Sequence, residues 1–559
     1  MQRRAIPIAG LVLVALTAAW PVRGQTETMV SMPDGVQLAT DVYLPLGHGF
    51  GPWPVILQRT PYGKQSELSA NTCQVFRLDG FVCVAQDVRG TGRSGGTNTV
   101  FRDDRVDGQA TIGWITRQPW SNDKVGTFGG SALGITEYAL APGAPAALKC
   151  QLPVVATADF YHHAAFAGGA LRYGLAFPWL DGQNALGFFE EMKQHRLWDP
   201  WWQQVDVVSQ VGTVNIPGFH VGGWYDIFLQ GTLDAFRLTQ HLGGPQALGT
   251  QRLLIGPWTH TGLGGTQAGQ LTYPANAVSY GELLLGWRDW FEYHLMGKRP
   301  EVGRWPAVRI YLMGAAGEAG APGNLWLDLA DWPPPAWSVP YYLDDAGGLN
   351  QELPAGGQRP FTSDPARPVP TLGGANLFET VDGHAQGVGP QDQLEVEQRA
   401  DVLVFSSPVL TRPLTVVGPL RARLWVQSDT PDLDLAVRLT DVYPDGRSML
   451  VTDGMARARM RCGDDRECFL SPGEPAELLV ELTSTALVFN TGHRLRLSVS
   501  GSNWPRFEVN PNHGGDLNSP GAARVAHPTL LVGPAHPSRL ELPVFRPSMF
   551  PRRRLGTAR

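Results

Sequence analysis

The spacing of apolar and polar residues divides the chain into an α/β part and a later all-β part. Residues 36–44 alternate between apolar and polar types, which is typical of a half-buried strand, whereas residues 55–57 and 81–85 are continuous apolar runs, as in strands covered on both faces. A helical pattern follows over 104–119. This succession of strands and helices predicts an α/β domain whose first part spans residues 25–150.

Two changes of pattern interrupt and then end this rhythm. Residues 151–213 are rich in aromatic residues and alanine and predict an inserted helical cap. The α/β rhythm resumes over 214–320, where strands are expected at 216–221 and 252–255. Residues 321–559 contain Gly/Pro-rich linkers and many short alternating runs separated by turn residues, which predict an all-β sandwich or jelly roll.

The first 24 residues, 1–24, have the pattern of an export signal. Arg3 and Arg4 form a short basic region, and an apolar run over 5–20 follows. A membrane anchor is the alternative, but the run is shorter than the ~20 residues that a spanning helix needs, and Pro7 interrupts it. We therefore expect a cleaved signal peptide and a secreted or periplasmic protein without stable membrane insertion.

Composition and charge narrow the function classes. Apolar residues make up 43% of the chain and charged residues 17%, which is typical of a globular protein. The formal net charge is -6, and no Lys/Arg-rich block is present. Nucleic acid is therefore excluded as an expected partner, and the oligomeric state, a homo-oligomer included, stays open.

The five cysteines agree with an oxidising compartment. Cys462 and Cys468 lie six residues apart in a polar loop, where a local disulfide is expected. A zinc site is disfavoured there because no second Cys/His pair has suitable spacing. Cys83 lies in an apolar run and is expected to be a buried thiol, whereas Cys73 and Cys150 stay unassigned.

Ser131 is the candidate nucleophile. It follows a short apolar strand inside the segment Phe-Gly-Gly-Ser-Ala-Leu-Gly (128–134), and an alanine-containing helical stretch comes next. A nucleophilic serine needs a sharp strand-to-helix turn with small neighbours. The strict Gly-x-Ser-x-Gly spacing is not met, because the downstream glycine is Gly134. The alternative is a serine that only caps a helix in a Gly-rich loop.

Two further residues could complete a catalytic triad with this serine. Asp226 follows one apolar strand through Gly-Gly-Trp-Tyr, and His260 follows the next through Gly-Pro-Trp-Thr. Both would lie at the carboxyl ends of strands, where open α/β sheets place their sites. The chain order serine, acid, base is that of α/β-hydrolases. Each residue alone is a weak signal, since most histidines are structural, and it is their order and placement that predict a triad.

A glycine-rich segment could be mistaken for a cofactor site. Residues 90–95 match the Gly-x-Gly-x-x-Gly pattern and follow a strand, but the residues after them do not open an apolar helix. We expect a structural turn, with Asp87 and Arg89 as a local ion pair. No metal or organic cofactor is expected anywhere in the chain.

Six short segments, spread over most of the chain, together form a specific signature. They are Met-Pro-Asp-Gly-Val-Gln-Leu (32–38), Arg-Thr-Pro-Tyr-Gly-Lys (59–64), Asp-Val-Arg-Gly-Thr-Gly-Arg-Ser-Gly-Gly (87–96), Gln-Pro-Trp-Ser-Asn (118–122), Asp-Val-Tyr-Pro-Asp-Gly-Arg (441–447) and Gly-His-Arg-Leu-Arg-Leu (492–497). In these segments the chain resembles the cocaine esterase family of α/β-hydrolases. That family also includes α-amino-acid ester hydrolases, cephalosporin acylases and X-prolyl dipeptidyl aminopeptidases.

The resemblance implies an α/β-hydrolase domain with an inserted helical cap and a C-terminal jelly roll. It also implies that Ser131 is the nucleophile, Asp226 the acid and His260 the base. Tyr62 matches the oxyanion-hole tyrosine of the family, beside the backbone N–H of Ala132. The family commonly has tyrosine where this chain has Ala132, so a wider pocket is expected beside the nucleophile. A core tyrosine with a satisfied hydroxyl is the alternative for Tyr62.

The substrate is expected to be a small-molecule ester or related acyl compound. Aromatic residues of the cap, such as Trp179, favour an apolar acyl group, although they could equally only bury the cap. An acyl-amide, amino-acid ester or X-prolyl dipeptidyl hydrolase is the second hypothesis, and its ammonium group would need a carboxylate from Asp159, Asp181, Glu190 or Glu191. The third is a non-catalytic jelly-roll binding protein, for which acids such as Asp432 and Asp434 would hold calcium or sugar. Solvated acids in turns are the favoured interpretation of these two residues.

Overall fold

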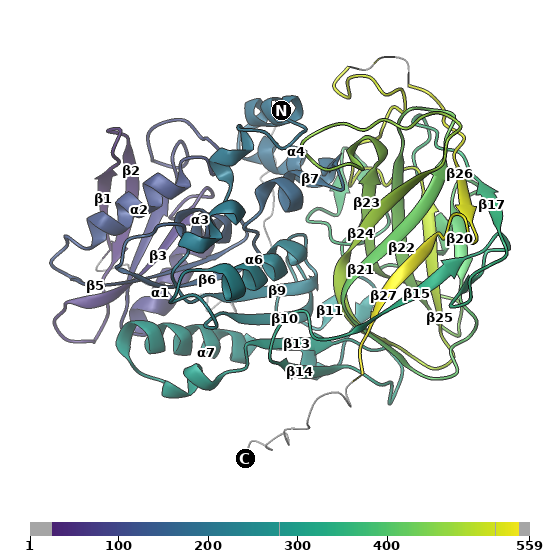
Figure 1. Ribbon diagram of the computed structural model, residues 1–559. Helices are drawn as coiled ribbons and strands as arrows, with labels where there is room; N and C mark the ends of the chain where they lie inside the picture. Colours follow the sequence, from purple (N-terminus) through teal and green to yellow (C-terminus); the bar gives the residue numbers. More distant parts are fainter. Residues whose placement is uncertain (1–24, 279, 520, 522, 547–559) are drawn as a thin grey trace.

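A ten-stranded sheet forms the first part of the molecule (Figure 1). The computed structural model describes residues 25–278, 280–519, 521 and 523–546. In the spatial order given next, the strands from β4 to β13 run parallel to one another, and antiparallel strands form both edges of the sheet. In spatial order they are β1 (Gln25–Ser31), β2 (Gln37–Tyr43), β4 (Val82–Asp87), β3 (Trp53–Thr60), β5 (Ser121–Gly130), β6 (Leu148–Val154), β9 (Phe219–Tyr225), β10 (Arg252–Thr259), β13 (Val308–Leu312) and β14 (Leu325–Leu329).

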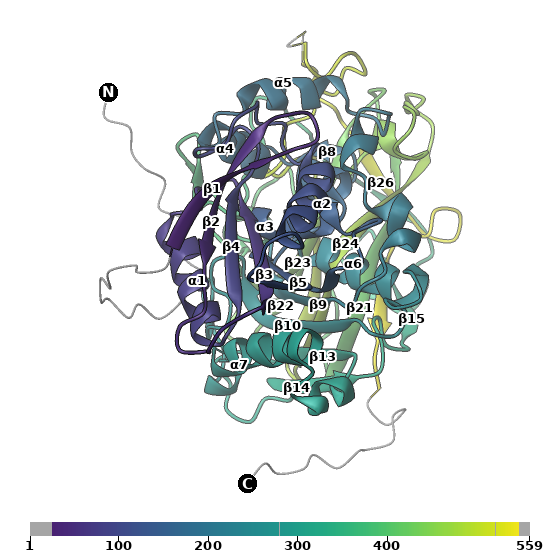
Figure 2. The ribbon, with the colours of Figure 1, turned by 90° about the vertical axis from the view of Figure 1, so that its left-hand side faces the viewer.

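Helices cover both faces of this sheet because its strands are apolar on both sides. Ile56 and Cys83 point to one core, which also contains residues of α1 and α7, while Val55 and Val84 point to a second core with residues of α2 and α3. In Figure 2 this sheet and its helices face the viewer. The helices are α1 (Glu67–Leu78), α2 (Asp104–Ile115), α3 (Ala132–Leu140), α6 (Leu229–Leu242) and α7 (Tyr280–Phe291).

The predicted cap lies between β6 and β9 and is mainly helical. Its own core is aromatic, with Trp202 and Tyr161 fully buried. It packs beside the all-β part, and the strands β7 and β8 contact β23 there (Figure 1). The cap elements are η1 (Tyr161–Ala165), a π-helix, β7 (Phe166–Ala167), β8 (Ala170–Leu171), α4 (Tyr173–Gly182), α5 (Leu186–Gln194), η2 (Trp202–Val205) and η3 (Val208–Thr213).

The C-terminal part is an eleven-stranded β structure of predominantly antiparallel strands. One large hydrophobic core joins it to the first sheet, and β24 bonds through Ala486 and Val488 to Met313 just after β13. Its strands are β15 (Trp337–Leu343), β16 (Leu349–Asn350), β17 (Gly357–Pro360), β20 (Leu403–Ser406), β21 (Leu414–Gln427), β22 (Asp434–Val442), β23 (Ser448–Arg457), β24 (Ala476–Phe489), β25 (Arg494–Ser500), β26 (Thr529–Val532) and β27 (Arg539–Val544).

Short elements complete the described chain. They are β11 (Gln267–Ala268), β12 (Leu271–Thr272), η4 (Ala275–Ala277), η5 (Glu292–Met296), η6 (Pro300–Arg304), β18 (Thr380–Val381), β19 (His384–Ala385), α8 (Leu394–Glu397) and η7 (Ala458–Met460). No helix among the described residues has the length and apolar character needed to cross a membrane. The expected signal peptide, residues 1–24, lies outside the described residues.

The structure changes three expectations about the chain. Cys83 is not a free thiol: it forms a disulfide with Cys73, because α1 packs on the face of β4 to which Cys83 points. The strand expected from Ile216 begins instead at Phe219, because the intervening Pro217 has no N–H for the ladder. The first sheet also extends to β14, beyond residue 320. The expected Cys462–Cys468 disulfide is confirmed, and Cys150 is a buried free cysteine.

Candidate active site

Ser131 stands at a sharp turn between β5 and α3. Its backbone is in a strained region, with φ 59° and ψ −125°, as expected at a nucleophile elbow. Small neighbours are required there: a Cβ on Gly129 would lie 2.4 Å from Leu133 Cβ, and one on Gly134 would lie 2.6 Å from Ala156 Cβ. Downstream of Ser131, the position where crowding requires a glycine is therefore 134. The Ser131 side chain makes no capping hydrogen bond, so the interpretation as a simple helix cap is wrong.

The next two candidates reach Ser131 from adjacent parallel strands. β9 and β10 pair so that Tyr225 lies beside Thr259, which places Asp226 and His260 together just after the strand ends. His260 Nε2 lies 2.9 Å from Ser131 Oγ, and His260 Nδ1 lies 2.5 Å from Asp226 Oδ2. Both side chains are buried, and the other Asp226 oxygen accepts the Phe228 N–H at 2.7 Å. This geometry suits proton transfer from serine to histidine, with the carboxylate holding the imidazole in one tautomer.

Two hydrogen-bond donors lie beside the serine hydroxyl. Tyr62 follows β3, and its hydroxyl accepts the Trp179 indole N–H at 2.9 Å. Burial raises the pKa of Tyr62, and hydrogen bonds with Trp179 and Ser131 act in the opposite direction. The phenol therefore stays protonated at neutral pH and can donate to an oxyanion. Ala132 begins α3, so its backbone N–H is one of the helix-start amides that have no partner within the helix.

An apolar pocket adjoins this group. None of the acids that the sequence offered for an ammonium group is among its lining residues. Asp159 instead bonds His162 at 2.7 Å, and Glu190 and Glu191 pair with Lys193 and Arg102, respectively. The pocket, called the acyl pocket below, is lined by Phe101, Ser131, Ala132, Ile135, Phe160, Ala164, Ala165, Leu175, Ala176, Trp179, Leu180, Met192, Ile227, Phe228 and Leu377.

Most of these lining residues were not named from the sequence. Phe101, Phe160, Phe228 and Leu377 come from four separate segments and carry no local signal of a shared surface. The sequence indicates Trp179 as a cap aromatic, but its hydrogen bond to Tyr62 depends on how the cap packs on the sheet. Among the described residues, no group of three His, Cys, Asp or Glu side chains is arranged to hold a metal ion.

Residues 90–95 form a structural turn. Its backbone is closed by the hydrogen bond from the Gly90 N–H to the Gly95 carbonyl. The prediction of an ion pair between Asp87 and Arg89 is wrong. Asp87 accepts the backbone N–H groups of Lys64 and Arg93, while Arg89 pairs with Asp107 at 2.7 Å and with Asp34 at 2.6 Å.

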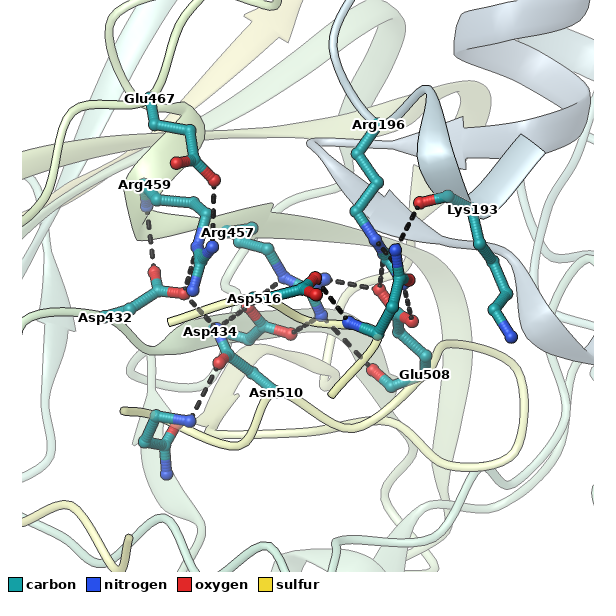
Figure 3. Close-up of polar contacts among 12 residues, drawn as sticks. Lys193, Arg196, Asp432, Asp434, Arg457, Arg459, Glu467, Glu508, Asn510 and Asp516 are labelled. Atoms are coloured by element: carbon teal, nitrogen blue, oxygen red, sulfur yellow. Dashed lines mark hydrogen bonds and ion pairs between the residues drawn. The ribbon is translucent and has the colours of Figure 1, made fainter. Parts of the chain in front are cut away.

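The acids considered for calcium are engaged with arginines of the all-β part. Asp434 pairs with Arg457 at 2.9 Å and Asp432 with Arg459 at 2.7 Å (Figure 3). The side chains are buried, and Asn510 donates to both carboxylates. The expectation that Asp432 and Asp434 are solvated turn acids is therefore wrong, because both belong to a buried ion-pair network.

Two family models match the chain and together extend over most of it. The model described as X-Pro dipeptidyl-peptidase (S15 family) matches residues 34–188 and 181–262. The model described as X-Pro dipeptidyl-peptidase C-terminal non-catalytic domain matches residues 300–541.

Similar proteins include esterases. The cocaine esterase of Rhodococcus sp. (strain MB1 Bresler) is 31% identical over 586 aligned positions, covering 93% of this chain and 98% of that protein. A putative serine esterase of Mycobacterium bovis is 26% identical, covering 93% of this chain and 95% of that protein.

Solved structures share the complete architecture. An α-amino acid ester hydrolase is 24% identical with a TM-score of 0.79, over 97% of this chain and 100% of that chain. An aminopeptidase from a Thaumarchaeota archaeon of marine sediment is 24% identical with a TM-score of 0.81, over 93% of this chain and 96% of that chain. At these identities the likeness shows the fold, and it confirms an α/β-hydrolase domain followed by a β-rich domain.

Proposed function

This chain belongs to the cocaine esterase-like family of α/β-hydrolases and is a serine hydrolase, and on that premise we propose that it cleaves carboxylic esters through an acyl-enzyme on Ser131. The observation that carries the proposal is the hydrogen-bonded chain from Ser131 through His260 to Asp226, beside an apolar pocket.

The proposed cycle has two acyl transfers. Ser131 Oγ attacks the ester carbonyl while His260 Nε2 accepts its proton, and Tyr62 and the Ala132 N–H donate to the oxyanion. His260 then returns the proton to the departing alkoxide, which leaves as an alcohol. Water attacks the acyl-enzyme in the same way and releases the carboxylic acid and free Ser131.

The acyl pocket favours a neutral acyl group over an amino-acyl group. An ammonium group buried against these apolar walls would lose its hydration without gaining a carboxylate partner, which is costly. Esters with aromatic or branched aliphatic acyl groups are therefore the proposed substrates. Amino-acid ester and X-prolyl dipeptidyl hydrolysis remain the second proposal, supported by the names of the α-amino acid ester hydrolase and of the S15 family model.

We also propose that the enzyme is exported and acts in the periplasm or outside the cell. The basic and then apolar start of the chain supports this proposal. The two disulfides support it as well, since disulfides persist in oxidising compartments. Its expected partner is a small-molecule ester or acyl substrate, and a homo-oligomer stays open.

Labelling with a fluorophosphonate tests the nucleophile. We expect one label per chain on the peptide that contains Ser131, no label on Ser131→Ala, and normal labelling of Ser31→Ala, which removes an exposed serine. Labelling of Ser131→Ala at the wild-type rate would contradict the proposal.

A substrate panel tests the specificity. It compares phenylacetyl, acetyl and phenylglycyl esters of the same phenol with an X-Pro anilide. We expect the phenylacetyl ester to give the highest kcat/KM. A preference for the phenylglycyl ester or the anilide would favour the second proposal instead.

A further inference from the structure

A second cavity, of about 510 Å³, lies where the cap, the hydrolase domain and the β-rich domain meet. The π-helix η1 separates it from the acyl pocket: Ala164 and Ala165 line the acyl pocket, whereas His162 and His163 line this second cavity. Ile227 borders both spaces, and Asp226 of the proposed triad also lines the second cavity. We call the second space the junction cavity.

Two buried arginines in the wall of the junction cavity lack full compensation. Arg172 donates to the carbonyl oxygens of His163 and Ile227 and has no carboxylate within ion-pair distance among the described residues. Arg506 pairs with Asp453 at 2.5 Å, but its buried Nε has no hydrogen-bond partner within that part of the chain.

The surroundings do not balance this charge. Buried Arg438 lies behind the wall and donates to the neutral side chains of Ser500 and Asn503. Asp226 and Asp453 are the carboxylates that act on Arg172, and Asp226 already bonds His260. Asp453 and Glu397 act on Arg438, and Glu397 already pairs with Arg496 at 2.7 Å.

A neighbouring buried arginine, Arg457, does have carboxylate partners. Arg457, which also lines the junction cavity, pairs with Asp434 and with Glu508, and Glu508 in turn receives Arg196 from the cap (Figure 3). A buried charge without a partner is costly, so it usually has a counter-ion. The contrast indicates that Arg172, beside the incompletely bonded Arg506, can accept a counter-ion from outside the chain.

Burial and the nearby charge of Arg506 lower the pKa of Arg172 to about 9, although Asp226 and Asp453 act in the opposite direction. At neutral pH the guanidinium is still charged. A bound anion would reverse this depression.

We propose that the junction cavity binds a small organic monocarboxylate, whose carboxylate group pairs with Arg172 and Arg506. A monoanion suits this site better than a dianion, because Asp226, Asp453, Asp464 and Glu481 also line the walls. Tyr161 and Phe507 offer apolar surface to the organic part. Because Arg172 also holds the Ile227 carbonyl, next to Asp226, occupancy of the cavity would steady the loop that carries the acid of the triad.

Calorimetric titration with benzoate tests this site on full-length enzyme whose Ser131 has been sulfonylated with phenylmethylsulfonyl fluoride, so that the acyl pocket is filled. We expect saturable binding of one benzoate and at least tenfold weaker binding of neutral benzamide. Mass spectrometry of the sulfonylated enzyme reports separately on the proposed function. If Ser131 is not modified, that function fails, and the titration is run on unmodified enzyme.

Variants locate the bound anion. Arg506→Met should weaken benzoate binding at least tenfold, while Arg447→Met, an exposed arginine outside the cavity, should change it less than twofold. Arg506→Met leaves Asp453 buried and unpaired and could unfold the chain. Leu479→Asp avoids this problem, because Leu479 is 39% exposed on the cavity wall, and its added negative charge should weaken binding severalfold. Equal binding of benzoate and benzamide, or unchanged binding in Leu479→Asp, would overturn the proposal.

Discussion

The acyl pocket and the junction cavity lie on opposite sides of one π-helix but have opposite chemistry. The acyl pocket is lined by aromatic and aliphatic side chains around Ser131, whereas the junction cavity is lined by arginines, histidines and acids from three parts of the chain. A single turn of η1 supplies small apolar side chains to one and imidazoles to the other. The difference would separate two kinds of recognition: on our proposals, the acyl group is selected by shape and desolvation, and a charged ligand by ion pairing.

The largest expected effect isolates the chemistry of the acyl pocket. Ser131→Ala removes the proposed nucleophile and should lower kcat for a phenylacetyl ester by roughly 10⁴–10⁶-fold. The junction cavity does not include Ser131, so benzoate binding should stay within twofold of the wild type. Steady-state kinetics and calorimetry on one preparation measure both. Near-normal turnover by Ser131→Ala would contradict the assignment of catalysis to Ser131 in the acyl pocket.

The next effect concerns Tyr62, the proposed oxyanion donor. Tyr62→Phe keeps the ring and removes the hydroxyl, so it should lower kcat by roughly 10²–10³-fold with little change in KM, because the lost hydrogen bond forms mainly in the transition state. Steady-state kinetics with one phenylacetyl ester measure this. A rise in KM at constant kcat would instead indicate that Tyr62 only shapes the pocket.

A smaller effect tests the width of the acyl pocket. Ala132→Tyr introduces the residue that is common in the family and should fill space beside Ser131. We expect kcat/KM to fall by roughly 10–200-fold for a phenylacetyl ester and far less for an acetyl ester, as is usual when a pocket loses room for part of a substrate. Equal losses for both esters would indicate damage to the elbow rather than a narrower pocket.

The smallest effect concerns the attachment of η1 to the β-rich domain. His162 bonds Asp159 and, across the junction, Asp464, each at 2.7 Å. Burial alone would lower the pKa of His162, but these two carboxylates raise it to about 9, above its ordinary value of 6.5. The stabilisation from this raised pKa is complete below about pH 6.5 and disappears as the pH rises through about 9.

The corresponding variant is His162→Gln. It should lower the melting temperature by on the order of 1 °C at pH 6.5, since His162 is partly exposed, and the difference from the wild type should vanish near pH 10. Differential scanning calorimetry at both pH values measures this. A difference in melting temperature that stays constant with pH would show that the charge of His162 does not stabilise the contact between η1 and the β-rich domain.

Local patterns predicted what lies at the ends of strands. Ser131, Asp226 and His260 each follow an apolar strand, so their meeting at one edge of the sheet could be expected from the sequence alone. Contacts between distant segments could not be predicted in this way. Cys73 and Cys83 are joined because a helix packs on one particular face of β4. An apolar run alone does not identify that face.

The junction cavity was beyond sequence reasoning for the same reason. Arg172 and Arg506 are more than three hundred residues apart in the chain. Whether a buried arginine is balanced depends on which carboxylates the tertiary structure brings near, and Arg457 shows that the same residue type can be fully paired a short distance away. Charge counts along the sequence do not contain this information.

The most direct test of the central claim is to trap the acyl-enzyme. The enzyme is mixed with p-nitrophenyl phenylacetate, quenched in acid within milliseconds, digested and analysed by mass spectrometry. We predict one phenylacetyl group on Ser131 and none on the matching peptide of the Ser131→Ala variant. A phenylacetyl group on another residue, or rapid turnover of the wild type without any modified Ser131, would contradict the account.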